Sequence, residues 1–282
     1  MKIIPSSRRH HYLARVNIFL VAVALVAGMA GCDGYTPPSE DLQICDWYDL
    51  DAVRNNLAGN HILMNDLDST TAGYMELASE TANGGKGWQP IGTFAGSFDG
   101  QGYEIRDLYG AGLFGRVFPR GVIKDVGLVN VTVTSEWNVG SLVGENWGTV
   151  SNCYSSGNVT GDSRVGGLVG DNWYYRGILS NSYSTGSVTG STQVGGLVGY
   201  NKATVSNSFW DRLTSGMEES DGGVGKTTAE MMDIATFIDT KTQGLDEPWD
   251  IIAVTPGEIN LIPTWNIVVG QTYPFLSWQS AA

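Results

Sequence analysis

Two acidic side chains, Glu145 and Asp171, stand at equivalent positions of neighbouring sequence repeats. If the repeats stack, the two carboxyl groups lie one strand apart, where repulsion and burial would raise the pKa of one of them. A carboxyl pair at that spacing could act on a glycosidic bond as acid and base. The third repeat has Tyr200 here, and no Lys or Arg is clearly grouped with the pair. Solvated turn carboxylates are therefore the preferred interpretation, and a polysaccharide lyase or hydrolase is the alternative.

The sequence has few residues that could support histidine-dependent catalysis or bind a metal. The histidines are His10, His11 and His61, and no His-Glu-x-x-His motif of a zinc protease occurs. A Ser-His-Asp triad could use only His61, which stands in a predicted strand and is interpreted as structural. Asp66 and Asp68 do not complete a calcium-binding loop. The sequence therefore predicts no metal and no cofactor.

The segment 221–228, Asp-Gly-Gly-Val-Gly-Lys-Thr-Thr, is close to a phosphate-binding loop. The standard motif needs glycine where Ser220 stands, and it needs a buried strand leading into the loop. Residues 215–220 are polar instead. We therefore expect no nucleotide to bind.

Aromatic residues give the best indication of a binding surface. Five of them cluster in repeat junctions and turns: Trp137, Trp147, Trp173, Tyr174 and Tyr175. Stacked repeats would gather these side chains along one side, and exposed aromatic rings suit sugars or protein partners. The alternative is that several of them cover a loop or the edge of the core.

The elements that must position these residues are internal repeats. Three copies begin at Val139, Val165 and Val194, which gives periods of 26 and 29 residues. A degenerate copy begins at Ala111, 28 residues before Val139. Each copy contains three short β-prone pieces separated by Gly, Asn and Ser. A unit this short cannot bury its own apolar residues, so the copies must stack as coils of parallel strands.

Stacking predicts columns of like residues. The expected columns are Leu142, Leu168 and Leu197; Tyr154, Tyr183 and Phe209; an amide ladder of Asn152, Asn181 and Asn207; and small residues at Cys153, Ser182 and Ser208. The longer second period predicts an outward loop over residues 173–178. A disulfide between Cys45 and Cys153 is left open.

The Gly-Gly-Leu-Val-Gly cores, followed by Ser-Asn-Ser-Tyr-Ser-Thr-Gly, resemble the GLUG repeat family. Such repeats occur in adhesin-like bacterial surface proteins and in the non-catalytic region of immunoglobulin A1-specific metallopeptidases. The resemblance implies an all-β protein, a short parallel β-helix (β-solenoid). It implies no peptidase activity, because the histidines for it are missing.

Both ends of such a stack expose strand edges that need covers. Residues 46–57 are predicted to form an amphipathic helix at the N-terminal end, and Thr227 has capping-box spacing to Glu230 in a helix through about Ile238. We expect that helix and the strands after it to close the C-terminal end. The predicted organisation is a signal peptide over 1–31, a tether over 32–42, an N-terminal cap with leading coils over 43–110, the GLUG β-helix over 111–212, and a C-terminal cap with a short helix and closing strands over 213–282.

The first 31 residues have a basic start and an apolar run that ends in Met29-Ala30-Gly31-Cys32. This pattern resembles a bacterial lipobox, which implies cleavage before Cys32 and its lipidation. Without this segment, 12 basic residues face 29 acidic ones, a net charge of −17. Such a surface repels phosphate backbones, so nucleic-acid binding is not expected.

Together these features predict an exported lipoprotein, held at the cell envelope by a lipid anchor alone, with the membrane face left open. The leading hypothesis is non-enzymatic, adhesin-like binding of a glycan or protein through the β-helix surface. The polysaccharide-active enzyme is the first alternative. A structural cell-envelope spacer is the second.

Overall fold

The computed structural model describes residues 42–173 and 176–279. The predicted signal peptide, nearly all of the tether, Cys32, Tyr174 and Tyr175 lie outside the described residues. Within this part of the chain, no helix is long and apolar enough to cross a membrane.

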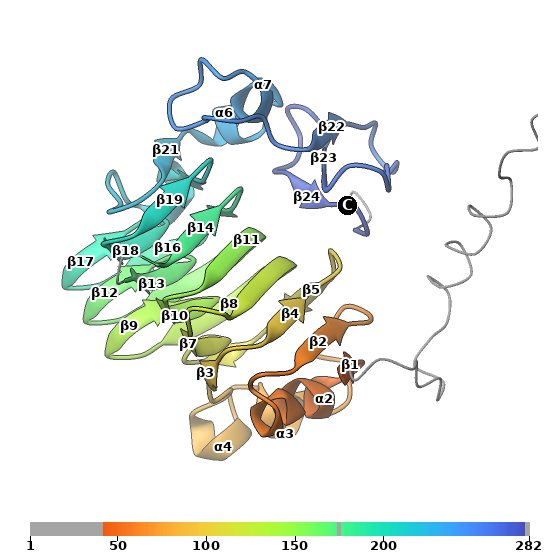
Figure 1. Cartoon of the computed structure of the whole chain (residues 1–282), viewed down its shortest axis with the longest axis vertical. Helices are drawn as coiled ribbons and strands as arrows, with labels where there is room; N and C mark the ends of the chain where they lie inside the picture. The colour runs from red at the N-terminus through yellow and green to blue at the C-terminus, as the bar shows by residue number, and fades with distance from the viewer. Residues whose placement is uncertain (1–41, 174–175, 280–282) are drawn as a thin grey trace, which may run out of the picture. The chain divides into compact units, whose positions relative to one another are not determined.

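The chain winds through three sheets whose strand pairs are all parallel, which confirms the predicted parallel β-helix (Figure 1). The first sheet contains β1 (Leu42–Ile44), β2 (Asn60–Leu63), β4 (Ser97–Asp99), β5 (Glu104–Arg106), β6 (Tyr109–Gly110), β8 (Val122–Thr134), β11 (Thr149–Thr160), β14 (Ile178–Ser180), β15 (Tyr183–Ser184), β16 (Ser187–Thr189), β19 (Thr204–Ser206), β20 (Phe209–Asp211) and β21 (Val224–Lys226). The second contains β3 (Ile91–Phe94), β7 (Phe114–Val117), β10 (Val143–Asn146), β13 (Val169–Asn172) and β18 (Val198–Asn201). The third contains β9 (Trp137–Gly140), β12 (Ser163–Gly166) and β17 (Thr192–Gly195).

Equivalent positions of the sequence repeats pair with one another in neighbouring strands. Val143 pairs with Val169, and Val169 pairs with Val198. The preceding leucines, Leu142, Leu168 and Leu197, are fully buried and form the predicted column inside the coils. The degenerate copy joins the same stack, because Phe114 pairs with Val143.

The predicted amide ladder exists at a different set of asparagines. Asn152, Asn181 and Asn207 lie at corners with positive φ (52°, 48° and 46°), and no hydrogen bonds link their side chains to one another. The ladder is formed instead inside the coils: Asn146 Nδ2 donates to Asn172 Oδ1, and Asn172 Nδ2 donates to Asn201 Oδ1, both at 2.9 Å. The prediction placed the ladder on the wrong asparagines: in the corner column Asn152 Nδ2 donates to Asp125 Oδ1 of the preceding coil at 2.9 Å, and Asn207 Oδ1 accepts the backbone N–H of Asp246 at 2.8 Å.

The small-residue column is confirmed. The backbone N–H of Cys153 donates to Ser182 Oγ at 3.1 Å, and the N–H of Ser182 donates to Ser208 Oγ at 3.2 Å. Cys153 is a free, fully buried thiol, so it does not pair with Cys45. Burial raises the pKa of the Cys153 thiol well above its usual range, which keeps it protonated.

The N-terminal end is covered by short helices, as predicted. Helix α2 (Trp47–Ala52) begins at Asp46, whose carboxylate caps the first turn, and continues as a 3-10 helix (Val53–Asn55). It buries Trp47, Leu50 and Val53 against the first coils. Two further short helices, α3 (Tyr74–Leu77) and α4 (Ala82–Gly85), lie at the same end (Figure 1).

The C-terminal segment covers the C-terminal end of the β-helix and also one of its sides. It contains α5 (Arg212–Ser215), α6 (Thr228–Met231), α7 (Ala235–Ile238) and a small sheet of β22 (Ile251–Ala253), β23 (Trp265–Ile267) and β24 (Phe275–Leu276). The single helix predicted from Thr227 is two short helices, and the predicted capping box is present. The aromatic column Tyr154, Tyr183 and Phe209 faces out of the coils and is buried by this segment in a second hydrophobic cluster.

Candidate functional site

The second sheet, together with Arg164 from β12 of the third sheet, positions a surface of aromatic and arginine side chains from successive coils. We call it the aromatic–arginine face; it consists of Arg116, Phe118, Trp147, Arg164, Trp173 and Tyr200. Strands β7, β10, β13 and β18 stack to form its base (Figure 1). Arg116 pairs with Glu145, Glu145 with Asp171, and Asp171 with Tyr200, so one column of this face consists of three charged residues followed by a tyrosine.

The rings of this face are held by one another and by cations. Phe118 stacks on Trp147 with ring centroids 5.6 Å apart and planes at 14°, and Trp173 lies 5.4 Å from Tyr200. The Arg116 guanidinium lies 5.3 Å from the Trp147 ring, and that of Arg164 lies 5.5 Å from the Trp173 ring. Such cation–π contacts restrict the side chains, so the rings and guanidinium groups hold one another in place.

The carboxyl pair predicted as one strand apart is in register, but its surroundings differ from the prediction. Arg116 donates to both oxygens of Glu145, at 2.7 and 3.0 Å, and Arg164 donates to Asp171 Oδ2 at 2.6 Å. The expectation that no arginine is grouped with the pair is wrong, and so is the expectation that Asp171 is a solvated turn residue, because it is 2% exposed in β13. A carboxylate engaged at both oxygens, as Glu145 is, is placed for structure rather than for proton transfer.

Burial raises the pKa of Asp171 to about 6; Arg164 opposes this effect and Glu145 adds to it. The folded protein therefore binds this proton more tightly than the unfolded chain, whose carboxyl titrates near 3.8. The contribution of Asp171 to folding stability must then fall as the pH rises from about 4 to about 6.

We expect Asp171→Asn to remove this dependence. Relative to the unsubstituted protein, the variant should gain stability progressively between pH 4 and pH 7, by at most about 3 kcal/mol. Urea unfolding at pH 4, 5.5 and 7 measures the difference. A difference that stays constant with pH would contradict the buried, proton-binding Asp171.

The structure brings together only part of the predicted aromatic cluster. Trp147 and Trp173 belong to the aromatic–arginine face, and Tyr174 and Tyr175 lie outside the described residues. Trp137 stands apart in β9, paired with Ser163 and 65% exposed, and it contacts no other ring of residues 42–173 and 176–279.

Sequence reasoning missed Phe118 and Tyr200. A signal for Phe118 was present, because it occupies the position of Trp147 in the degenerate first repeat. Tyr200 replaces a carboxylate in the third repeat, and only the coil geometry shows that its ring meets Trp173.

Other residues that the sequence offered as catalytic or phosphate-binding candidates are buried and contact backbone carbonyl groups. His61 is fully buried in β2, and its Nε2 lies 2.8 Å from the Asn56 carbonyl oxygen. Lys226 of the loop-like segment is buried in β21, where its Nζ donates to the Gln243 carbonyl and lies 5.4 Å from the Phe209 ring. No cluster of metal-ligating side chains occurs among the residues that the structure describes.

Comparison with known proteins identifies the repeats. The family model described as the GLUG motif matches residues 135–160 and 161–189. Halomucin of Haloquadratum walsbyi is 32% identical over 132 residues, and a protein of Evansella cellulosilytica described as a candidate Gly-rich membrane protein is 34% identical over 119 residues. These matches cover 39% and 36% of this chain but only 1% and 13% of the two relatives.

A solved structure gives a weaker likeness. It is described as a candidate immunoglobulin A1 protease from Bacteroides ovatus, and it superimposes with a TM-score of 0.43 at 18% identity. The match covers 69% of this chain and 68% of the other. A likeness at this level carries no argument about function.

Proposed function

We propose that this chain, a GLUG-repeat protein folded as a parallel β-helix, is a non-enzymatic binding protein of the cell envelope. The aromatic–arginine face is its proposed contact surface for a glycan or protein ligand. The observation that carries the proposal is the presence of two ring pairs on successive coils, each beside an arginine. Aromatic and arginine side chains are enriched among the residues that dominate binding energy.

An envelope location is supported by two independent features. The start of the sequence resembles a lipoprotein signal, and the two relatives bear the names of a mucin and a membrane protein. Because this chain spans a small share of either relative, their names support the location and leave the ligand open.

We expect Trp147→Ala and Trp173→Ala each to weaken ligand binding by roughly tenfold or more, as loss of an aromatic anchor does. The measurement is binding of the purified chain to a glycan array and, in parallel, in vivo crosslinking to envelope proteins. Trp137→Ala is the matched control, because it removes an exposed Trp outside the face. Unchanged binding in both test variants would remove the aromatic–arginine face from the proposal, and a chain that captures neither glycan nor protein would favour the structural spacer.

We further propose that Cys32 is the lipid-bearing N-terminal residue. Mass spectrometry of the protein from membranes should show an N-terminal peptide that begins at Cys32 and carries acyl chains, and Cys32→Ala should release the protein from the membrane fraction. A thioether-linked Cys32 cannot form a disulfide. Recovery of a peptide in which Cys32 is disulfide-linked to Cys45 would therefore overturn the anchor.

A further inference from the structure

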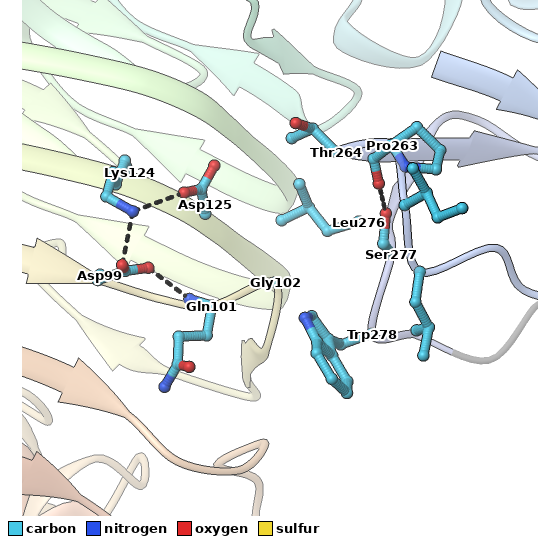
Figure 2. A pocket seen from close by; sticks show the side chains of 12 residues that line it. Asp99, Gln101, Gly102, Lys124, Asp125, Pro263, Thr264, Leu276, Ser277 and Trp278 are labelled. Atoms are coloured by element: carbon cyan, nitrogen blue, oxygen red, sulfur yellow. Dashed lines mark hydrogen bonds and ion pairs between the residues drawn. The ribbon is translucent and has the colours of Figure 1, made fainter. Parts of the chain in front are cut away.

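A cleft separates the coils from the C-terminal segment, away from the aromatic–arginine face. Its volume is about 270 Å³. One wall comes from the first sheet, where β4 and β8 supply Asp99, Lys124 and Asp125; the other comes from residues 261–264 and 276–278 (Figure 2). Segments separated by more than a hundred residues therefore meet at this place.

The wall on the coils is a compact ion-pair network. Lys124 Nζ donates to Asp99 Oδ2 at 2.5 Å and to Asp125 Oδ2 at 2.9 Å. Burial alone would lower the pKa of Lys124, but the hydrogen bonds to the two carboxylates outweigh it and raise that pKa. Because the ammonium already lies between the carboxylates, the place that a divalent cation would take is filled. The wall keeps one net negative charge, which disfavours anionic ligands.

The facing wall is apolar and aromatic. Trp278 is 47% exposed, and Leu261 and Ile262 beside it are also exposed. Trp278 is held in position, because the next residue, Gln279, donates from Nε2 to the Gly102 carbonyl at 3.1 Å. Gly102 has φ +85°, and a Cβ there would lie only 3.0 Å from Trp278 Cδ1, so glycine is needed where the indole meets the coil.

We propose that this cleft binds a neutral glycan, with Trp278 as the platform for a sugar ring. A pyranose has an apolar C–H face and a rim of hydroxyl groups, which match one wall each: the indole for the C–H face, and the carboxylates and ammonium for the hydroxyls. The cleft volume suits a mono- or disaccharide unit of a longer, solvent-exposed chain. The site is separate from the aromatic–arginine face, so each of the two binding proposals can be correct without the other.

The test is affinity electrophoresis of the full chain in gels that contain dextran or galactomannan, both neutral, with alginate as the anionic comparison. We expect a neutral polysaccharide to retard the protein and alginate to leave it unretarded. Trp278→Ala should weaken retardation at least about tenfold, Trp278→Phe should keep most of it, and Asp99→Asn should weaken it several-fold. Trp137→Ala, which removes an exposed Trp outside both the cleft and the aromatic–arginine face, should bind like the unsubstituted chain.

The outcomes separate this site from the proposed contact surface. Retardation that Trp147→Ala abolishes and Trp278→Ala preserves would overturn the cleft and support the aromatic–arginine face. Absence of retardation by both neutral polysaccharides would overturn the cleft alone, because the face is tested by the array and by crosslinking. If circular dichroism shows that Trp278→Ala is unfolded, the retardation of Trp278→Phe and Asp99→Asn tests glycan binding in the cleft instead.

Discussion

Asn172→Ala should destabilise the protein by about 3–5 kcal/mol, one of the two largest effects that we expect from a single substitution. The side chain is fully buried and makes three hydrogen bonds: it accepts from Asn146 Nδ2 and donates to Asn201 Oδ1 and to the Thr204 carbonyl, at 2.9, 2.9 and 3.1 Å. Alanine satisfies none of them. Each buried group left without a partner costs about 1–3 kcal/mol, and the loss is felt by the coils on both sides.

The matched control is Asn181→Gly in the neighbouring column. Asn181 has φ +48°, a conformation that glycine adopts without strain, and its backbone N–H donates to the Ser206 carbonyl at 3.3 Å. We expect a change within about 0.5 kcal/mol. Urea unfolding followed by circular dichroism compares the two variants. Equal effects would mean that the ladder inside the coils contributes no more than a surface asparagine does.

These two asparagines show which features of the structure the alignment of the repeats can predict. Aligned repeats predict which residues stack, since each copy must pair with the next, and this fixed the coils, the leucine column and the aromatic column. The alignment does not say whether a column points inward, sideways or outward. A local signal for the inner ladder was present: Asn146 stands two residues before Gly148 and accepts its N–H at 3.1 Å, a turn typical of asparagine.

The candidate site was predictable to the same extent. Trp147 and Trp173 were found because they recur in the repeats, and Arg116 could have been found because it aligns with Glu145 in the first, degenerate copy. Arg164 could not, because its contact with Asp171 depends on a left-handed corner (φ 55°) that turns it toward the next strand of its own coil. The cleft at Trp278 was also out of reach, since the C-terminal segment has no repeat to align.

The C-terminal segment is attached to the coils through the aromatic column Tyr154, Tyr183 and Phe209. This column faces outward and is not part of the core inside the coils. Tyr154 and Tyr183 stack at 5.1 Å with planes at 8°, and Tyr183 also lies 5.9 Å from Trp265 and 6.2 Å from Tyr273. Its hydroxyl donates to the Pro274 carbonyl. Tyr183 thus contacts both a strand residue, Trp265, and the turn at Tyr273 and Pro274 of the C-terminal segment.

Tyr183→Ala should therefore cost about 3–5 kcal/mol, the range for truncation of a large buried aromatic residue. Because the side chain faces out of the coils, we expect the C-terminal segment to detach first, while the inner leucine and amide ladders persist. Limited proteolysis should then cut between residues 239 and 264 before the β-sheet circular dichroism signal is lost. Tyr183→Phe keeps the ring contacts and loses only the hydroxyl bond, so it should cost about 0.5–1.5 kcal/mol. Cleavage of Tyr183→Ala within the coils at the same rate as within the C-terminal segment would show instead that the two hydrophobic clusters unfold as one unit.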